Sequence, residues 1–443
     1  MTHHPQKSKL LISIVFAHLI WSLLMIFLGS NAFTLDSYSY LKAAKNIVTH
    51  GHTYCANWPV DIVLPERFSF RTPGYPLFLA LFNPAFFGFE LVFLIQNLIS
   101  IITCYALALF IREELKLSNK QAKVFLGICL VLFPVQCWYT RQVLTEIVFQ
   151  STLFFSMLCA WKWQKERSQL NLMASAILMA ISLLIKPVLL YFIPIYMVYL
   201  LLICKRQFSW HYLMIFLPVL VWYSMASIHK KTTGLFHYSS IAYIHNINYN
   251  VKYSLAPEFG VAMADSIVKG IHQEANKKNN LTEKVQFLND TALTVITKYP
   301  SNMALYYLKG LIGFWLDPGR FDIYQLLNIK QDKKQSFGVF TGQITPQSLI
   351  EKWRDYPFII VIFMAINALG GILLLISFVY LLFEPMLRKK FILFIMLVAY
   401  ISIITGGVGA LRFRLEILPF LILFFAYFYK HLCHKFNNPT SHT

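Results

Sequence analysis

Two consecutive segments decide the fold class: LLISIVFAHLIWSLLMIFLG (residues 10–29) and SNAFTLDSYSYLKAAKNIVTHG (residues 30–51). A membrane-spanning helix needs about 20 mostly apolar residues. The first segment has that length and contains no Asp, Glu, Lys or Arg. The second segment is polar, and Asp36 is its first charged residue. Together they predict a chain that crosses a membrane and leaves it at a carboxylate.

The composition extends this prediction to the whole chain. Of 443 residues, 57% are hydrophobic and only 13% are charged. Apolar runs near the spanning length predict about ten transmembrane helices and an all-α integral membrane protein. The runs are residues 10–29, 88–111, 122–137, 143–161, 170–186, 188–204, 211–228, 357–383, 391–408 and 415–429.

Basic residues in the short connections predict the orientation, because lysine and arginine are retained on the cytoplasmic side. With the N-terminus inside, the inner connections carry the following basic residues: Lys7, Lys9, Arg112, Lys116, Lys120, Lys123, Lys162, Lys165, Arg167, Lys205, Arg206, Arg388, Lys389, Lys390 and Lys430. The net charge of +19 therefore reflects this bias and contact with anionic lipids. No basic-aromatic module for nucleic acid fits between the spans.

This alternation of inner and outer connections divides the chain into three predicted regions. Residues 1–228 form an N-terminal transmembrane core, whose first span stays as an anchor and whose first outer loop (30–87) carries interfacial helices and the catalytic groups. Residues 229–356 form a long, partly helical second outer loop, in which 262–298 are amphipathic with a break near NKKNN. Residues 357–443 return to the membrane and end in a cytoplasmic tail.

The helix predicted after the first span has an apolar face formed by Leu41, Ala44, Ile47 and Val48, and Gly51 stands where a helix stop belongs. Asp36 lies at its beginning and has two interpretations. It is the N-cap of the helix, or it is a base at the membrane surface.

Two further outer features carry charge. Arg71 precedes the turn Thr72-Pro-Gly-Tyr-Pro at the start of an apolar run, where an arginine needs an anionic partner such as a lipid headgroup or a substrate phosphate. In WYTRQVLTEIVF, Arg141 and Glu146 lie at the outer junction of the third and fourth spans. Glu146 is a second outer carboxylate, and pairing with Arg141 is its structural alternative.

Cysteines and histidines predict little. Of seven cysteines, Cys55 and Cys137 are the pair that could form an outer disulfide. His229, His237 and His245 recur every eight residues, which does not stack metal ligands on a helix, and we interpret them as loop histidines.

Five motifs in order resemble the polytopic GT-C glycosyltransferases, and more narrowly the bacterial branch related to protein O-mannosyltransferases and the lipid A aminoarabinose transferase. The motifs are DSYSYLKAAKNI, RTPGYPLFLAL, LTEIVFQSTLFF, AILMAISLLIKPVLLYFIP and GALRFRLEILPFLIL. The resemblance covers about residues 10–235 and 290–430. Ser37 departs from the paired acidic motif of the mannosyltransferases, and Lys186 stands where an arginine before proline is more usual.

The resemblance implies a sugar transfer from a polyprenyl-phosphate donor to a lipid or protein acceptor on the outer face of a bacterial inner membrane. It implies that Asp36 and Glu146 are catalytic, and that Arg71 binds the donor phosphate together with Lys186, Arg412 or Arg414. Acceptor or loop candidates are Tyr40, Tyr75, Arg141, Tyr238 and Asn246. The last two lie in residues 229–250, which are rich in Tyr, His and Asn. Such side chains stack on sugar rings and hydrogen-bond hydroxyls, and the alternative is ordinary loop packing. No cofactor is predicted, and a divalent cation stays open. A ligase or polymerase using a diphosphate-linked oligosaccharide and a lipid-linked sugar flippase are the alternatives.

Overall fold

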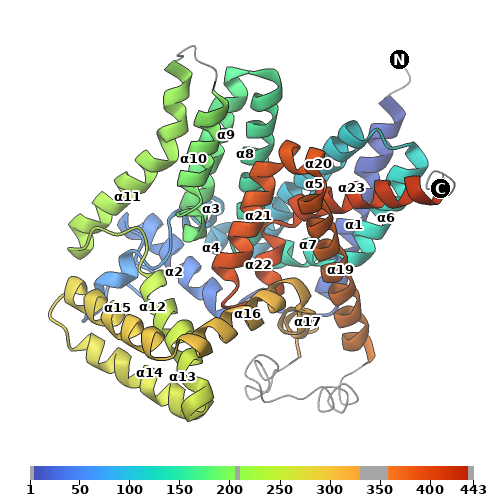
Figure 1. The fold of residues 1–443 in the computed structure, drawn as a ribbon. Coiled ribbons are helices and arrows are strands. Elements are labelled where there is room, and N and C mark those ends of the chain that lie inside the picture. Colours follow the sequence, from blue (N-terminus) through green and yellow to red (C-terminus); the bar gives the residue numbers. More distant parts are fainter. Residues whose placement is uncertain (1–3, 205–209, 330–357, 438–443) are drawn as a thin grey trace.

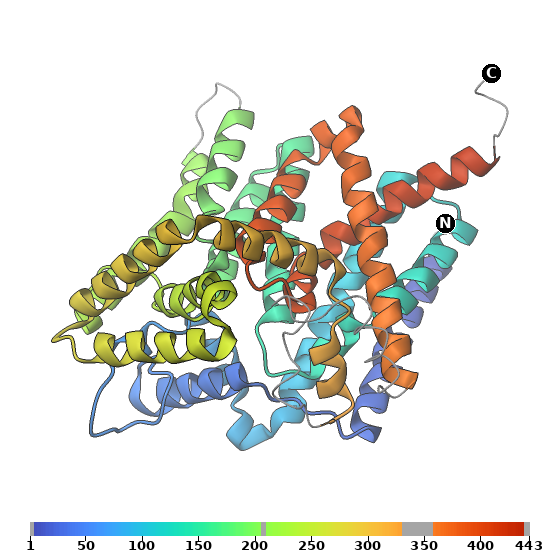
Figure 2. The ribbon, with the colours of Figure 1, turned by 60° about the horizontal axis from the view of Figure 1, so that its bottom comes forward.

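The computed structural model describes residues 4–204, 210–329 and 358–437, and every regular element in those ranges is a helix. This confirms the predicted all-α class. The helices form a bundle with a layer of shorter helices at one end (Figures 1 and 2).

Thirteen helices form the bundle: α1 (His4–Phe27), α5 (Phe89–Leu115), α6 (Asn119–Leu132), α7 (Val135–Trp138), α8 (Glu146–Glu166), α9 (Gln169–Ile185), α10 (Ile193–Ile203), α11 (Leu217–Thr233), α19 (Phe358–Phe383), α20 (Pro385–Lys390), α21 (Ile392–Thr405), α22 (Leu411–Leu415) and α23 (Leu418–Asn437). The layer at its end contains α2 (Leu35–His50), α3 (Gly74–Phe82), α4 (Pro84–Phe87), α12 (Ile241–His245), the π-helix η5 (Asn246–Val251), α13 (Lys252–Phe259), α14 (Val261–Asn276), α15 (Leu281–Lys298), α16 (Pro300–Leu316) and α17 (Arg320–Leu326).

Several bundle helices are apolar enough to cross a membrane. Among the described residues, four are long enough to span it: Lys9–Phe27, Phe89–Leu115, Trp210–Thr233 and Phe358–Phe383. A fifth candidate, Lys120–Leu132 with Val135–Arg141, is bent by 63° at a break that contains Pro134, which cannot continue a helix. Shorter apolar helices accompany them: Gly74–Phe87, Gln169–Ile185, Ile193–Ile203, Ile392–Thr405 and Leu418–His434. The chain is therefore a multi-pass membrane protein.

The connections predicted to share one side of the membrane contact one another at the upper end of the bundle in Figure 1. Glu114, near the end of α5, accepts from Lys165 of α8 at 3.4 Å and also contacts Lys390 of α20. Lys430 of α23 donates to the carbonyl of Leu115 at 2.7 Å. The layer of shorter helices, which includes α13, α14 and α15, lies at the opposite end.

The helices α13 to α15 have a small apolar core of their own, which includes Val251, Leu255, Val268 and Leu288. The predicted break near NKKNN separates α14 from α15, where Asn280 accepts from the backbone N–H of Glu283 at 2.9 Å and caps α15. Residues 262–298, for which one or two amphipathic helices were predicted, form α14 and α15. Figure 2 shows this layer from below, with α14 in yellow.

The interfacial helix α2 has the predicted limits but a different cap. Thr34 is its N-cap, forming a capping box with Ser37, and Gly51 ends it in the left-handed region at φ 72°. The interpretation of Asp36 as the N-cap is therefore wrong, because Asp36 lies inside the first turn. The predicted apolar face is partly correct: Ala44 is buried as predicted, but Val48 is 56% exposed, and Tyr40 and Ala43 are buried as well.

Candidate functional site

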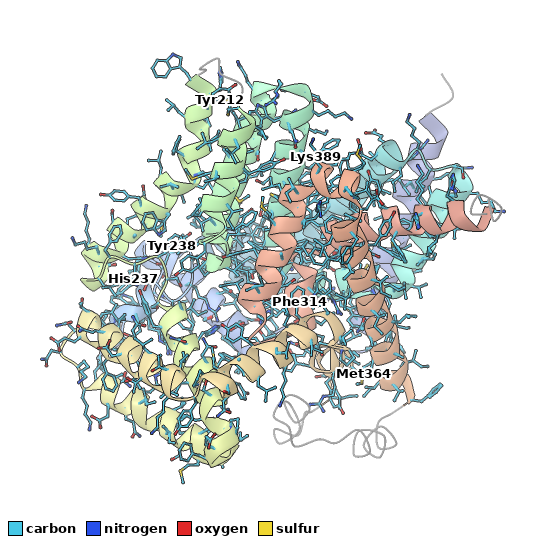
Figure 3. All side chains as sticks on the ribbon, viewed as in Figure 1. Tyr212, His237, Tyr238, Phe314, Met364 and Lys389 are labelled. Atoms are coloured by element: carbon cyan, nitrogen blue, oxygen red, sulfur yellow. The ribbon has the colours of Figure 1, made fainter. Side chains whose placement is uncertain are left out.

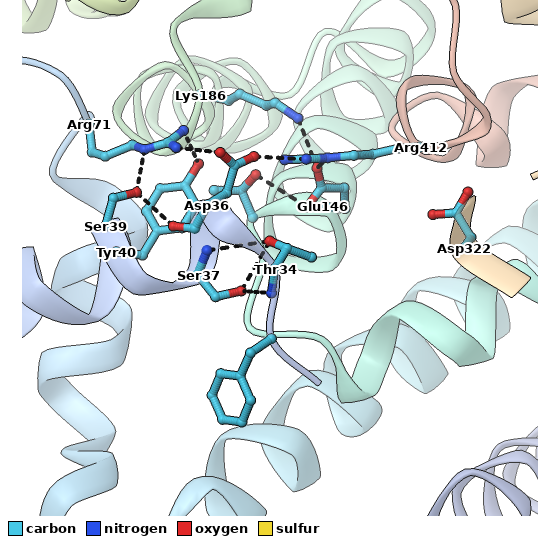
Figure 4. A network of polar contacts seen from close by, with 12 residues as sticks. Thr34, Asp36, Ser37, Ser39, Tyr40, Arg71, Glu146, Lys186, Asp322 and Arg412 are labelled. Carbon is cyan, nitrogen blue, oxygen red and sulfur yellow. Dashed lines mark hydrogen bonds and ion pairs between the residues drawn. The ribbon is translucent and has the colours of Figure 1, made fainter. Parts of the chain in front are cut away.

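The site is centred on the carboxylate of Asp36, which two arginines bind from opposite parts of the sequence (Figure 4). Arg71 Nη2 donates to Oδ1 at 2.5 Å, and Arg412 Nη1 donates to Oδ2 at 2.8 Å. Each carboxylate oxygen therefore accepts from a guanidinium, and such charge-assisted bonds are the stronger class of hydrogen bond.

Local structure fixes the position of Arg71. Its Nε donates to Ser39 Oγ at 2.8 Å and its Nη1 to the Tyr40 hydroxyl at 3.3 Å, both on α2. A Cβ added to Gly74 would lie 2.7 Å from the backbone of Leu184 and Ile185, so the Pro-Gly turn packs directly on the end of α9. Only glycine allows this approach, and it brings Arg71 to the end of the bundle.

A second, buried carboxylate continues the cluster. Glu146, at the first turn of α8, has no exposed side-chain surface and accepts from Arg412 Nε at 2.5 Å and from Lys186 Nζ at 3.2 Å. Lys186 also contacts Glu416, whose side chain is likewise buried. The cluster thus joins three carboxylates to three cations, and Arg412 links its outer half to its buried half. A buried charge of this kind is stable only when it is paired.

The electrostatics of Asp36 follow from its partners. Burial raises the pKa of its carboxyl, but the positive charges of Arg412 and Arg71 outweigh burial and hold the pKa well below its usual range. Asp36 is therefore ionised at neutral pH. While both guanidiniums bind it, the carboxylate has little affinity for a proton.

Asp322 of α17 lies on the far side of Arg412 in Figure 4. The hydroxyl of Tyr139 donates to its Oδ1. Burial, and after it the charge of Asp317, raises the pKa of Asp322 to about 7 although the bond from Tyr139 lowers it. Asp322 thus differs from Asp36 in protonation near neutral pH.

The remaining predicted residues lie outside this cluster. Arg414 is buried and donates to backbone carbonyls of Phe314, Trp315 and Asp317, so it holds α22 against the end of α16. Arg141 pairs with Glu90 at 2.9 Å, so its predicted pairing with Glu146 is wrong.

Three acceptor candidates also have structural partners. Tyr75 is buried and donates to Gln96 at 2.9 Å, although its ring lies edge-on to that of Tyr40. Tyr238, which Figure 3 shows beside His237, donates to the carbonyl of Leu183 at 2.8 Å. Asn246 accepts from Asn250 at 2.8 Å. Of these candidates, Tyr40 alone is bonded within the cluster.

Two residues of the segment 229–250 face the cluster although the sequence did not single them out as site residues. His245 ends α12 and Tyr249 lies in the π-helix η5, and both interact electrostatically with Asp36 and Arg412. The three histidines grouped by their spacing have separate roles. His237 bonds Ser69 Oγ at 2.6 Å and His229 bonds the carbonyl of His237 at 3.1 Å, which are structural contacts.

Cys55 and Cys137 are both free and buried, so the structure does not contain the disulfide considered between them. Within the described ranges, no group of three or more His, Cys, Asp or Glu side chains is arranged to hold a metal ion.

Comparison with known proteins gives one structural likeness. No family model matches the chain, and no curated protein matches it. The crystal structure of ArnT from Cupriavidus metallidurans in the apo state is similar with a TM-score of 0.36 and 12% sequence identity, covering 94% of this chain and 76% of that chain.

Proposed function

We propose that this chain is a membrane glycosyltransferase that moves a sugar from a polyprenyl-phosphate donor to a hydroxyl-bearing acceptor. In this proposal Asp36 is the general base, and Arg71 and Arg412 bind the donor phosphate. The observation that carries it is the binding of one partly exposed carboxylate by two arginines at the end of an apolar bundle. A lipid-linked substrate has its tail in the bilayer and its phosphate at that level.

Arg412 is the better placed of the two arginines to receive a phosphate. Its side chain is 24% exposed, against 8% for Arg71. Its Nη2 makes no hydrogen bond with any described residue, whereas Nη1 and Nε bind Asp36 and Glu146. A phosphate oxygen could therefore bind Nη2 first. Guanidinium groups bind phosphate in a forked geometry, so a second phosphate oxygen would then compete with Asp36 for Nη1.

Phosphate binding would also activate the base. A bound phosphate competes with Asp36 for the guanidinium N–H groups, because both are anionic acceptors. As the arginines turn to the phosphate, the pKa of Asp36 rises toward its usual range. Asp36 then has the proton affinity that a base requires, and it acquires this affinity only when the donor is present.

The transfer step is a displacement at the anomeric carbon. The acceptor oxygen forms a bond to that carbon, its proton passes to Asp36, and the bond from the carbon to the phosphate oxygen breaks. The lipid phosphate gains negative charge as it leaves, and Arg71 and Arg412 stabilise it. Glu146 holds Arg412 in position from the buried side, and Lys186 in turn holds Glu146, so both are positioning residues in this mechanism.

The transfer assay uses the purified chain in proteoliposomes with a radiolabelled polyprenyl-phosphate sugar and a cell-envelope lipid extract. Label that enters the extract only with this donor supports the proposal. Transfer only from a diphosphate-linked oligosaccharide would make the chain a ligase or polymerase. Movement of the intact donor between leaflets without transfer would make it a flippase.

We also propose the orientation given by the basic connections, with about ten spans and with residues 30–87 and 229–356 outside a bacterial inner membrane. Cysteines are introduced at Asn289 of α15 and at Gln169, where α9 begins; both positions are exposed. In sealed cells, an impermeant thiol reagent should label the Asn289→Cys variant and leave the Gln169→Cys variant at the level of the parent. The reverse pattern would overturn the orientation.

A further inference from the structure

The residues of α12, η5 and α13 place a column of aromatic rings beside the Asp36 cluster. His245, Tyr249 and Tyr253 are spaced four residues apart. An α-helix has 3.6 residues per turn, so side chains at this spacing drift around its axis. The π-helix from Asn246 to Val251 winds more slowly, because its hydrogen bonds join residues five apart, and it offsets that drift.

The rings at this spacing form two contacting pairs. The centroids of His245 and Tyr249 are 5.2 Å apart with an edge-on geometry. Tyr253 stacks on Tyr306 of α16 at 4.9 Å with an interplanar angle of 19°. A π-helical segment often marks a functional site, and Tyr249 of this segment interacts electrostatically with Asp36 and Arg412.

Residues 406–409 pack against α16, which carries Tyr306, and lead into the helix that carries Arg412. A Cβ on Gly310, one turn after Tyr306, would lie 1.7 Å from the carbonyl oxygen of Gly406. A Cβ on Gly407 would lie 3.5 Å from the hydroxyl of Tyr306. Residues 406–409 lead into α22, which carries Arg412. The distance between the rings and the phosphate-binding candidates is therefore set by close backbone packing.

His245 is available to bind a ligand. Its side chain is exposed, and neither ring nitrogen has a hydrogen-bond partner in the described part of the chain. Although the residue keeps an exposed surface, the protein around it removes part of the water from the imidazole. This effect, and secondly the positive charge of Arg71, lowers the pKa of His245 to about 4. The imidazole is therefore neutral at pH 7, and one ring nitrogen can accept a hydrogen bond from a hydroxyl.

We propose that His245 and Tyr249 form the acceptor subsite and that they bind a pyranose ring of an acceptor glycan. The Tyr249 ring packs against the apolar face of the sugar, and His245 accepts a hydrogen bond from a hydroxyl next to the reacting one. Tyr253 and Tyr306 extend the aromatic surface for a second sugar. This inference rests on the proposed transferase function and names a glycan as the class of acceptor.

A binding experiment tests the subsite without requiring transfer. The parent and its variants are placed in nanodiscs and titrated with a glucosamine disaccharide and with maltose. Saturation-transfer NMR gives the dissociation constants. Sorbitol, which has no sugar ring, is the control ligand. His245→Phe keeps an aromatic ring and removes the nitrogens, and should weaken binding about fivefold, the value of one neutral hydrogen bond. Tyr249→Leu should weaken it by a similar factor and Tyr249→Phe should not.

Matched controls are His50→Phe, which changes an exposed histidine at the end of α2, and Tyr223→Leu, which changes an exposed tyrosine on α11. Both should bind the disaccharides as the parent does. The subsite is overturned if the parent binds neither disaccharide more tightly than sorbitol, or if His245→Phe and Tyr249→Leu bind within twofold of the parent.

The transfer assay separates the two proposals. If the parent transfers sugar, the same variants should raise the acceptor KM about fivefold and leave the donor KM unchanged. If the parent does not transfer sugar but binds disaccharide through His245 and Tyr249, the transferase proposal fails and the glycan site stands.

Discussion

Replacement of Asp36 by asparagine tests the central residue of the proposed site. The amide has the size of the carboxyl but no charge and no basic oxygen. Because Thr34 and Ser37 cap α2, the start of the helix keeps its hydrogen bonds in this variant. Loss of a general base lowers turnover by a factor of about 10² to 10⁴. We expect turnover to fall within that range.

The cost to stability should be small by comparison. The variant weakens two charged hydrogen bonds, at 2.5 and 2.8 Å. Each such bond contributes about 1.5 to 3 kcal/mol when buried, and the 32% exposure of Asp36 reduces that value through solvent screening. Arg71 keeps Ser39 and Tyr40 as partners, and Arg412 keeps Glu146. A loss of about 2 kcal/mol follows.

The assay measures turnover per folded molecule in proteoliposomes, with folding checked by monodispersity in detergent. Thr34→Ala is the matched control. It removes the cap two residues away and should cost about 1 kcal/mol of stability, with turnover close to that of the parent. If the well-folded Asp36→Asn variant transferred sugar within about threefold of the parent, Asp36 would be only an anchor for the two arginines, since loss of a base costs at least about 10².

Three further changes test the surroundings of Asp36. Arg412→Lys should lower kcat/KM for the donor about 10- to 100-fold, because a lysine ammonium cannot replace a guanidinium that binds two carboxylates at once. In the same steady-state assay, the control Arg141→Lys should match the parent. The folded-state pKa of Asp322 is about 7 and its ordinary value is 3.8, so the parent should lose up to about 4 kcal/mol of stability as pH rises between those values. Asp322→Asn should flatten that part of the melting-temperature profile, and an unchanged profile would show that another group titrates. Gln150→Leu should cost about 1 to 3 kcal/mol, because the buried amide of Gln136 loses its partner; a melting temperature equal to that of the parent would contradict this.

Much of the fold was predictable because its determinants are local. Backbone hydrogen bonds of a helix join residues four apart, and a span needs only length and apolar character. The residues of 35–51 gave the limits of α2 correctly, since Gly51 adopts the left-handed conformation that ends a helix. The exact face of α2 was not predictable, because Tyr40 and Asn46 are buried by contacts with distant segments.

The sequence by itself determined the helical membrane class and a set of charged candidates, and it predicted that the basic connections share one side. Only the tertiary structure decided which charges meet. Arg412 and Arg414 are two residues apart, so at 3.6 residues per turn they point to nearly opposite sides of α22. Arg412 therefore reaches Asp36 and Glu146, while Arg414 reaches the carbonyls at the end of α16. The rotation of α22 decides which of the two arginines faces the site. Two contacts fix this rotation: Gln150 donates to the carbonyl of Leu415, and residues 406–409 pack closely on Gly310. Those contacts join segments far apart in the chain, and a local pattern does not encode them.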